Sequence, residues 1–93
     1  MKRTIADIKR ANKEAGYFFF KKDTLRYWNS VIDRHVYGNR FFVTSENMDG
    51  EEPRFTVRRF DPETSRIWVH GKHGGHRTLE LARDAAREAA REK

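Results

Sequence analysis

The sequence predicts an α+β domain, a three-stranded antiparallel sheet with helices packed on one side, in the order α-α-β-β-β-α. Two patterns predict this class. Apolar residues recur at helical spacing near both ends of the chain, while alternating side chains and turn residues occupy its middle. A chain of 93 residues has the size of one small domain, so we expect residues 1–93 to form a single domain.

The first helix is expected over about residues 4–15. Thr4 is followed three residues later by Asp7, which resembles a capping box with Asp in place of Glu. Gly16 is well placed to end the helix. The outer side of this helix would be basic, because it carries Lys9, Arg10 and Lys13.

A second helix is expected between Asp23 and the turn at residues 37–39. Asp23 would cap it, since an aspartate side chain accepts hydrogen bonds from free backbone N–H groups. Apolar residues recur at the spacing of one helical face, namely Leu25, Trp28 and Val31 or Ile32. The aromatic run at residues 17–20 would lead into this helix as a buried connector.

Three strands are expected next, over about residues 40–46, 54–60 and 66–70. The first link, residues 47–53, is acidic and is expected to be mobile. The second link begins with Asp61-Pro62, which favours a tight turn, so the last two strands should form a hairpin.

The expected hairpin register places side chains of the same kind opposite one another. With Asp61 opposite Ser65, Arg58 faces Trp68 across the strand pair. Successive side chains of a strand point to opposite faces, so arginine and aromatic side chains would collect on one face and apolar side chains on the other. A displacement by one residue would move every side chain of a strand to the other face.

This arginine and aromatic face is the first candidate binding surface. Its predicted members are Arg40, Phe42, Thr44, Arg54, Thr56, Arg58, Arg66, Trp68 and His70. Rings that stack on bases and guanidinium groups that pair with phosphates are common on sheets that bind nucleic acid. The alternative is that the first two helices cover this face, with Phe42 and Trp68 in the core.

A glycine-rich basic loop, residues 71–77, is the second candidate surface. Exposed backbone N–H groups and the positive end of the following helix would favour an anion there, with contacts from Lys72, His73 and Arg77. The glycine spacing differs from that of nucleotide-binding loops. An ordinary connection between a strand and a helix is the alternative.

The last helix is expected from Thr78 onward. A narrow face suited to close packing on a sheet is formed by Leu79, Ala82, Ala86 and Ala89 or Ala90. Basic and acidic residues each repeat every four positions, which places opposite charges three residues apart on the solvated side.

Several classes of function are not expected. The chain has no cysteine, which excludes disulfides, thiolate metal sites and a cysteine nucleophile. His70, His73 and His76 are spaced by three, but a closed metal site would need ligands from elsewhere, so no metal or cofactor is expected. The serines lie outside any nucleophile motif and no carboxylate pair stands out. We therefore expect neither an enzyme nor a small-molecule substrate.

The net charge of +6 has two interpretations. It indicates an acidic partner such as nucleic acid, or it serves solubility alone. The longest apolar run, residues 17–20, is far too short to span a membrane, and the first residues are polar. We expect a cytoplasmic protein with no membrane contact.

The run of elements from Asp23 onward resembles a double-stranded-RNA-binding domain in outline, with a glycine-rich basic loop before an alanine-rich helix. In this chain the last helix begins with the sequence RTLELAR, where that family has a lysine cluster. The ENMDGEE link also lacks the pattern of the loop with which that family contacts the minor groove. None of that family's contact residues is therefore carried over to this chain.

Four blocks cover nearly the whole chain: IKRANKEAGYFFF, DTLRYWNSVI, VYGNRFFVTSE and PRFTVRRFDPET. Together they are similar to a family of small uncharacterised proteins common in phages and prophages. The resemblance implies a phage-borne accessory protein that acts in the host cytoplasm. Small phage proteins of this kind often bind nucleic acid or inhibit a host defence complex, as anti-CRISPR proteins do.

Two hypotheses follow from these patterns. The first is a non-enzymatic module that contacts nucleic acid or a nucleoprotein complex through the arginine and aromatic face and the glycine-rich loop. The second is a protein-binding inhibitor of a host defence system, because the acidic segment at residues 46–52 would suit a basic protein surface.

Overall fold

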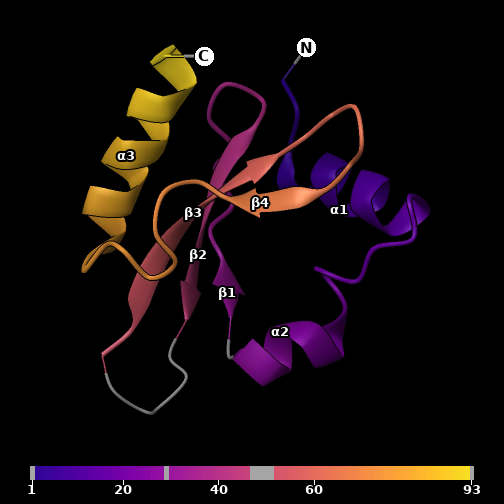
Figure 1. The fold of residues 1–93 in the computed structure, drawn as a ribbon, viewed down its shortest axis with the longest axis horizontal. Coiled ribbons are helices and arrows are strands. Elements are labelled where there is room, and N and C mark those ends of the chain that lie inside the picture. Colours follow the sequence, from indigo (N-terminus) through magenta and orange to yellow (C-terminus); the bar gives the residue numbers. More distant parts are fainter. Residues whose placement is uncertain (1, 29, 47–51, 93) are drawn as a thin grey trace.

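The computed structural model describes residues 2–28, 30–46 and 52–92 (Figure 1). These residues form three helices, α1 (Ile5–Glu14), α2 (Lys22–Trp28) and α3 (Leu79–Glu92). They also form four strands, β1 (Val31–Ile32), β2 (Phe41–Glu46), β3 (Arg54–Phe60) and β4 (Ile67–Val69). The strands make one antiparallel sheet in the order β1-β2-β3-β4, which confirms the α+β class. Most of the predicted acidic link, residues 47–51, lies outside the described residues.

The prediction of three strands is wrong, because β1 forms where the second helix was expected to continue. Val31 lies opposite Ser45 of β2, and Ile32 lies opposite Thr44. β-branched side chains favour extended backbone, and pairing with β2 supplies the hydrogen bonds that stabilise it. Helix α2 therefore ends at Trp28, well before its predicted end.

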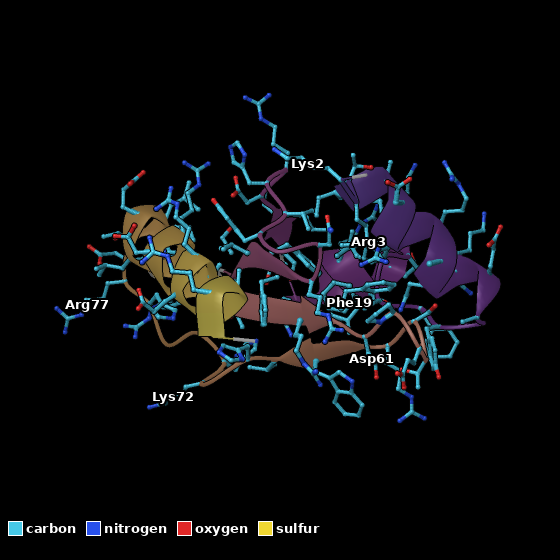
Figure 2. All side chains as sticks on the ribbon, turned by 90° about the horizontal axis from the view of Figure 1, so that it is seen from above. Lys2, Arg3, Phe19, Asp61, Lys72 and Arg77 are labelled. Atoms are coloured by element: carbon cyan, nitrogen blue, oxygen red, sulfur yellow. The ribbon has the colours of Figure 1, made fainter. Side chains whose placement is uncertain are left out.

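Helices lie on both faces of the sheet, not on one, with α3 on one side and α1 on the other (Figures 1 and 2). The α3 face is a core formed by Phe41, Val43, Val57, Ala82, Ala86 and Ala89. On the opposite face, Ile8 of α1 packs with Phe42 and Phe60. The reason is that Phe41-Phe42-Val43 is buried at every position, so both faces of β2 are apolar and each needs a cover.

The signals at the helix ends are largely confirmed. Thr4 and Asp7 form the reciprocal capping box, in which the Thr4 backbone N–H donates to the Asp7 carboxylate at 2.9 Å. Gly16 follows the end of α1 with a φ of 90°, a backbone conformation that glycine adopts readily. Asp23 differs from its prediction, because α2 already begins at Lys22 and Asp23 lies in its first turn.

The stability of the protein is expected to fall in acid partly through this capping box. Hydrogen bonds from Thr4 lower the pKa of Asp7 below its ordinary value of 3.8. A lowered folded-state pKa stabilises the folded protein above the unfolded pKa, and this contribution is lost as the pH falls through the folded pKa. Urea unfolding between about pH 2 and pH 6 should show a shallower acid loss for Asp7→Asn than for Glu14→Gln in the same helix. Equal profiles would contradict the capping role.

The β3–β4 hairpin is displaced by one residue from the predicted register. Arg58 lies opposite Val69, and Arg59 lies opposite Trp68. The turn is longer than predicted because Ser65 adopts left-handed backbone, with a φ of 63°. As side chains alternate along a strand, this displacement places Trp68 on the opposite face of the sheet from Arg58.

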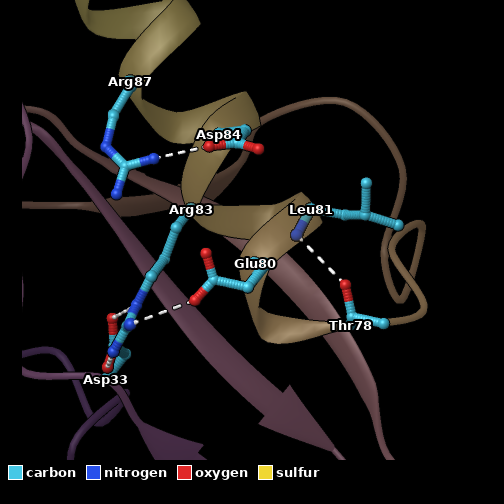
Figure 3. Close-up of polar contacts among 7 residues, drawn as sticks. All are labelled: Asp33, Thr78, Glu80, Leu81, Arg83, Asp84 and Arg87. Carbon is cyan, nitrogen blue, oxygen red and sulfur yellow. Dashed lines mark hydrogen bonds and ion pairs between the residues drawn. The ribbon is translucent and has the colours of Figure 1, made fainter.

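Helix α3 begins as predicted and carries the predicted ion pairs (Figure 3). The Thr78 hydroxyl accepts a hydrogen bond from the backbone N–H of Leu81 at 3.1 Å. The pairs three residues apart are Arg83 with Glu80 and Arg87 with Asp84. Arg83 also donates two hydrogen bonds, at 2.8 and 3.1 Å, to Asp33, which follows β1. This bidentate pair links α3 to the β1 side of the sheet, a contact that the sequence pattern did not indicate.

Candidate nucleic-acid interface

The sheet face predicted to bind nucleic acid is covered around its aromatic residue. Phe42 is fully buried, and the ring centroids of Phe19 and Phe20 lie 6.3 and 6.1 Å from its own. Both rings belong to the aromatic run between α1 and α2, which was predicted to be a buried connector. The prediction is correct for Phe19 and Phe20, but Phe18 is 63% exposed and Tyr17 is only half-buried. Phe42 is therefore a core residue, as the alternative interpretation of this face expected, whereas Trp68, which that interpretation also placed in the core, is 43% exposed.

A buried polar network occupies the rest of this face. It consists of Thr44, Glu46, Thr56 and Arg58. The Arg58 guanidinium donates to the Glu46 carboxylate at 2.8 Å, and the exposed side-chain fractions are only 12% and 4%. The ring of Phe19 lies 5.2 Å from the guanidinium carbon. Arg58 is thus held by a carboxylate and an aromatic ring inside the protein.

The glycine-rich loop is hydrogen-bonded to Thr56 of this network and to Arg54 of the same strand. The Gly74 backbone N–H donates to the Thr56 hydroxyl at 2.8 Å, and the Gly74 carbonyl accepts from Arg54 at 2.9 Å. Figure 2 shows Lys72 and Arg77 pointing away from the sheet next to α3. The loop therefore presents two basic side chains at one end of the molecule, while Arg54 serves to hold the loop.

The remaining predicted contact residues are dispersed. The ring of His70 packs against Phe41, with 5.1 Å between ring centroids, on the α3 face. His73 lines a cavity of about 230 Å³ together with Phe19 and Arg58. Arg40 is half-buried just before β2. The predicted residues thus do not form one surface.

A partly exposed aromatic strip lies instead beside strand β4, near the turn of the β3–β4 hairpin. We use this name for Tyr17, Arg66 and Trp68. The Arg66 guanidinium carbon lies 5.6 Å from the ring centroid of Tyr17 and 5.6 Å from that of Trp68. Arg66 Nε donates to the Tyr17 hydroxyl at 2.9 Å, which raises the pKa of Arg66 and keeps it charged. Trp68 is 43% exposed, so its ring is accessible to a partner.

A pocket of about 290 Å³ adjoins the aromatic strip at Tyr17. Its lining, which we call the lysine pocket, is Lys9, Asn12, Lys13, Tyr17, Phe20 and Lys21. The ion pairs within the described residues include none of these three lysines. Strip and pocket together therefore form a basic surface with accessible aromatic rings.

Residues 4–87 match DUF7447, a family of unknown function. The chain belongs to this family. The expectation of an uncharacterised family is thereby confirmed, and the DUF7447 match includes the whole aromatic strip and lysine pocket. No curated protein and no solved structure matches the chain.

A metal centre and a membrane-spanning helix are both missing from the described part of this DUF7447 member. Within the described ranges, no three His, Asp or Glu side chains gather closely enough to hold a metal ion. No helix in the described part of the chain has both the length and the apolar character needed to cross a membrane.

The residue types of the strip and pocket were recognisable in the sequence, but their arrangement as one surface was not. The basic outer side of α1 was recognised, and so was the aromatic run at residues 17–20. Tyr17 was missed as a surface residue because the run was expected to be buried. The signal that could have separated it is its hydroxyl group, which usually finds a hydrogen-bond partner or solvent.

Proposed function

We propose that this chain is a non-enzymatic module that binds single-stranded nucleic acid through the aromatic strip and the lysine pocket. The observation that carries the proposal is the position of Arg66 between Tyr17 and an exposed Trp68. Bases stack on accessible rings, and arginine and lysine side chains pair with the phosphates that connect them. The net charge of +6 adds attraction over longer distances.

Single strands suit this surface better than a duplex. The bases of a duplex are already stacked on one another, whereas an unpaired base is free to stack on Trp68. The phage-type origin implied by the sequence blocks supports a role on host or phage nucleic acid inside the infected cell.

A second candidate function is binding to a protein, as an anti-CRISPR-like inhibitor would. Strand β1 is at the edge of the sheet, and its Val31 is 67% exposed. An apolar cavity of about 280 Å³ lies beside it, lined in part by Phe55 and Leu79. An open edge strand next to apolar surface suits a partner that adds a strand. A pull-down from nuclease-treated bacterial lysate should then recover one defined protein, and recovery of nothing would count against this role.

The nucleic-acid proposal predicts salt-dependent binding that requires Trp68. Fluorescence anisotropy with a labelled single-stranded oligonucleotide should show an affinity that falls steeply as salt rises, because phosphate contacts release counterions. Trp68→Ala should weaken binding roughly tenfold to a hundredfold through lost stacking. Arg66→Ala should weaken oligonucleotide binding more than the control Arg91→Ala, which removes the same charge from the far end of α3.

Two outcomes would contradict this proposal. One is the absence of binding to any RNA or DNA at low salt. The other is binding that Trp68→Ala and Arg91→Ala leave equally unchanged, since attraction by net charge alone would then account for it.

A further inference from the structure

We propose that the lysine pocket binds one nucleotide, with the hydrogen-bonding edge of its base at Asn12 and its phosphate among the lysines. This inference deepens the proposed function by assigning a base-binding site to it. It is carried by an observation independent of the aromatic strip, namely a buried side chain with an unused acceptor.

Asn12 is the buried polar residue in the lining of the pocket. It is 1% exposed, and its Nδ2 donates to the carbonyl of Ser65 at 2.8 Å, which fixes the orientation of the carboxamide. Its Oδ1 is buried and has no hydrogen-bond partner among the described residues. A buried acceptor without a donor is costly, so a ligand that supplies an N–H group would gain free energy here. All nucleobases carry such a donor on their pairing edge.

The lysines supply the site for the phosphate. Lys9 and Lys13 are four residues apart on α1 and therefore lie on the same side of consecutive helical turns. Lys21 reaches the pocket from the segment before α2. The Lys9 and Lys21 ammonium groups lie over the rings of Phe20 and Phe18, at 5.9 and 5.3 Å from the ring centroids. Ammonium groups bind phosphate as point charges without a fixed geometry, so these flexible side chains can turn toward a phosphate.

The size and walls of the pocket suit one base. The volume of about 290 Å³ lies just below the range of about 300–1,000 Å³ typical of drug-sized ligands, so the pocket has room for a small group such as one base. Two of its lining residues, Tyr17 and Phe20, are aromatic and give the pocket apolar walls. The Lys9 ammonium lies 5.9 Å from the Phe20 ring centroid, and Arg66 lies 5.6 Å from that of Tyr17, so a planar base would pack beside these cations. Tyr17 also belongs to the aromatic strip, so a strand that stacks on Trp68 would place a neighbouring nucleotide in the pocket.

The test compares a free nucleotide with a nucleotide in a strand. Adenosine 5′-monophosphate, adenosine and inorganic phosphate are titrated against the full chain by NMR, and a labelled single-stranded oligonucleotide is titrated by anisotropy. We expect the monophosphate to bind more tightly than either of its parts and to shift the side-chain amide signals of Asn12. The double variant Lys9→Gln/Lys13→Gln should weaken both the monophosphate and the oligonucleotide by about tenfold or more. The control Lys22→Gln/Lys72→Gln removes the same charge outside the pocket and should weaken them much less.

The possible results separate this inference from the proposed function. If the oligonucleotide binds and needs Trp68, but neither the monophosphate nor the pocket lysines matter, the pocket assignment is wrong and the proposed function stands. If the monophosphate binds in the pocket but the oligonucleotide does not bind, the pocket takes a free nucleotide and the proposed function is wrong. If the monophosphate binds no better than inorganic phosphate, or if both double variants lose equally, the base-binding site is overturned.

Discussion

Replacing Arg58 by alanine will lower the free energy of unfolding by about 3–5 kcal/mol, because it leaves a buried carboxylate without its partner. The Glu46 side chain is 4% exposed and accepts a hydrogen bond from Arg58 at 2.8 Å. Two threonine hydroxyls also donate to Glu46, but neither brings a positive charge. Equilibrium unfolding in urea, followed by circular dichroism, measures the loss.

The control for this prediction changes both partners. In Arg58→Met/Glu46→Gln the buried charges are removed together, while the new carboxamide keeps an acceptor oxygen for one of the two threonine hydroxyls, so part of the stability should return. The exposed Arg91→Ala should stay within about 0.5 kcal/mol of the unchanged protein. A stable Arg58→Ala variant that has lost nucleic-acid binding would show that Arg58 is a contact residue after all.

Replacing Phe42 by alanine will cost about 3–5 kcal/mol of stability, the usual loss for a fully buried aromatic side chain. The cavity would open between β2 and the aromatic run, where the rings of Phe19 and Phe20 contact Phe42. Trp68→Ala is the matched comparison, because it also removes a large ring from the sheet. Trp68 is 43% exposed, so its loss should cost much less, about 1–2 kcal/mol.

The same two variants should have opposite effects on function. Trp68→Ala should fold and bind nucleic acid weakly, whereas Phe42→Ala should bind normally under conditions in which it is still folded. Comparable stability losses in the two variants would show that Trp68 is buried in solution, and the aromatic strip would then not be available to a partner.

Features that depend on neighbouring residues were predictable from the sequence. The capping box of Thr4 and Asp7 involves residues three apart, and the end of α1 at Gly16 depends on one backbone conformation. The small-residue face of α3 follows from helical spacing alone, and its alanines are buried as expected. Such signals are carried by short-range geometry and need no knowledge of the rest of the fold.

Features that depend on pairing between distant residues were not predictable. Strand β1 has two residues and exists because it pairs with β2, so helical spacing through Val31 gave the wrong element. The hairpin register depends on left-handed backbone at Ser65, a residue type that carries no strong signal for it. That one residue decides on which face Trp68 lies, and with it the composition of the aromatic strip.

The candidate site shows the same division. Basic residues on α1 and an aromatic run after it were visible in the sequence, but the surface arises where the hairpin tip meets α1. Asn12 donates to the Ser65 carbonyl, and Tyr17 accepts from Arg66, across 53 and 49 residues of chain. These two contacts hold Arg66 between the rings of Tyr17 and Trp68. Patterns of neighbouring residues do not predict contacts between residues this far apart in the sequence.

The most direct test of the account is a map of the bound surface by two-dimensional NMR, with a single strand of about ten nucleotides added to the full chain. The account predicts that the largest shifts occur at Tyr17, Arg66 and Trp68 and extend into the lysine pocket. Shifts concentrated instead at Lys72 and Arg77 of the glycine-rich loop, or no shifts at low salt, would contradict it.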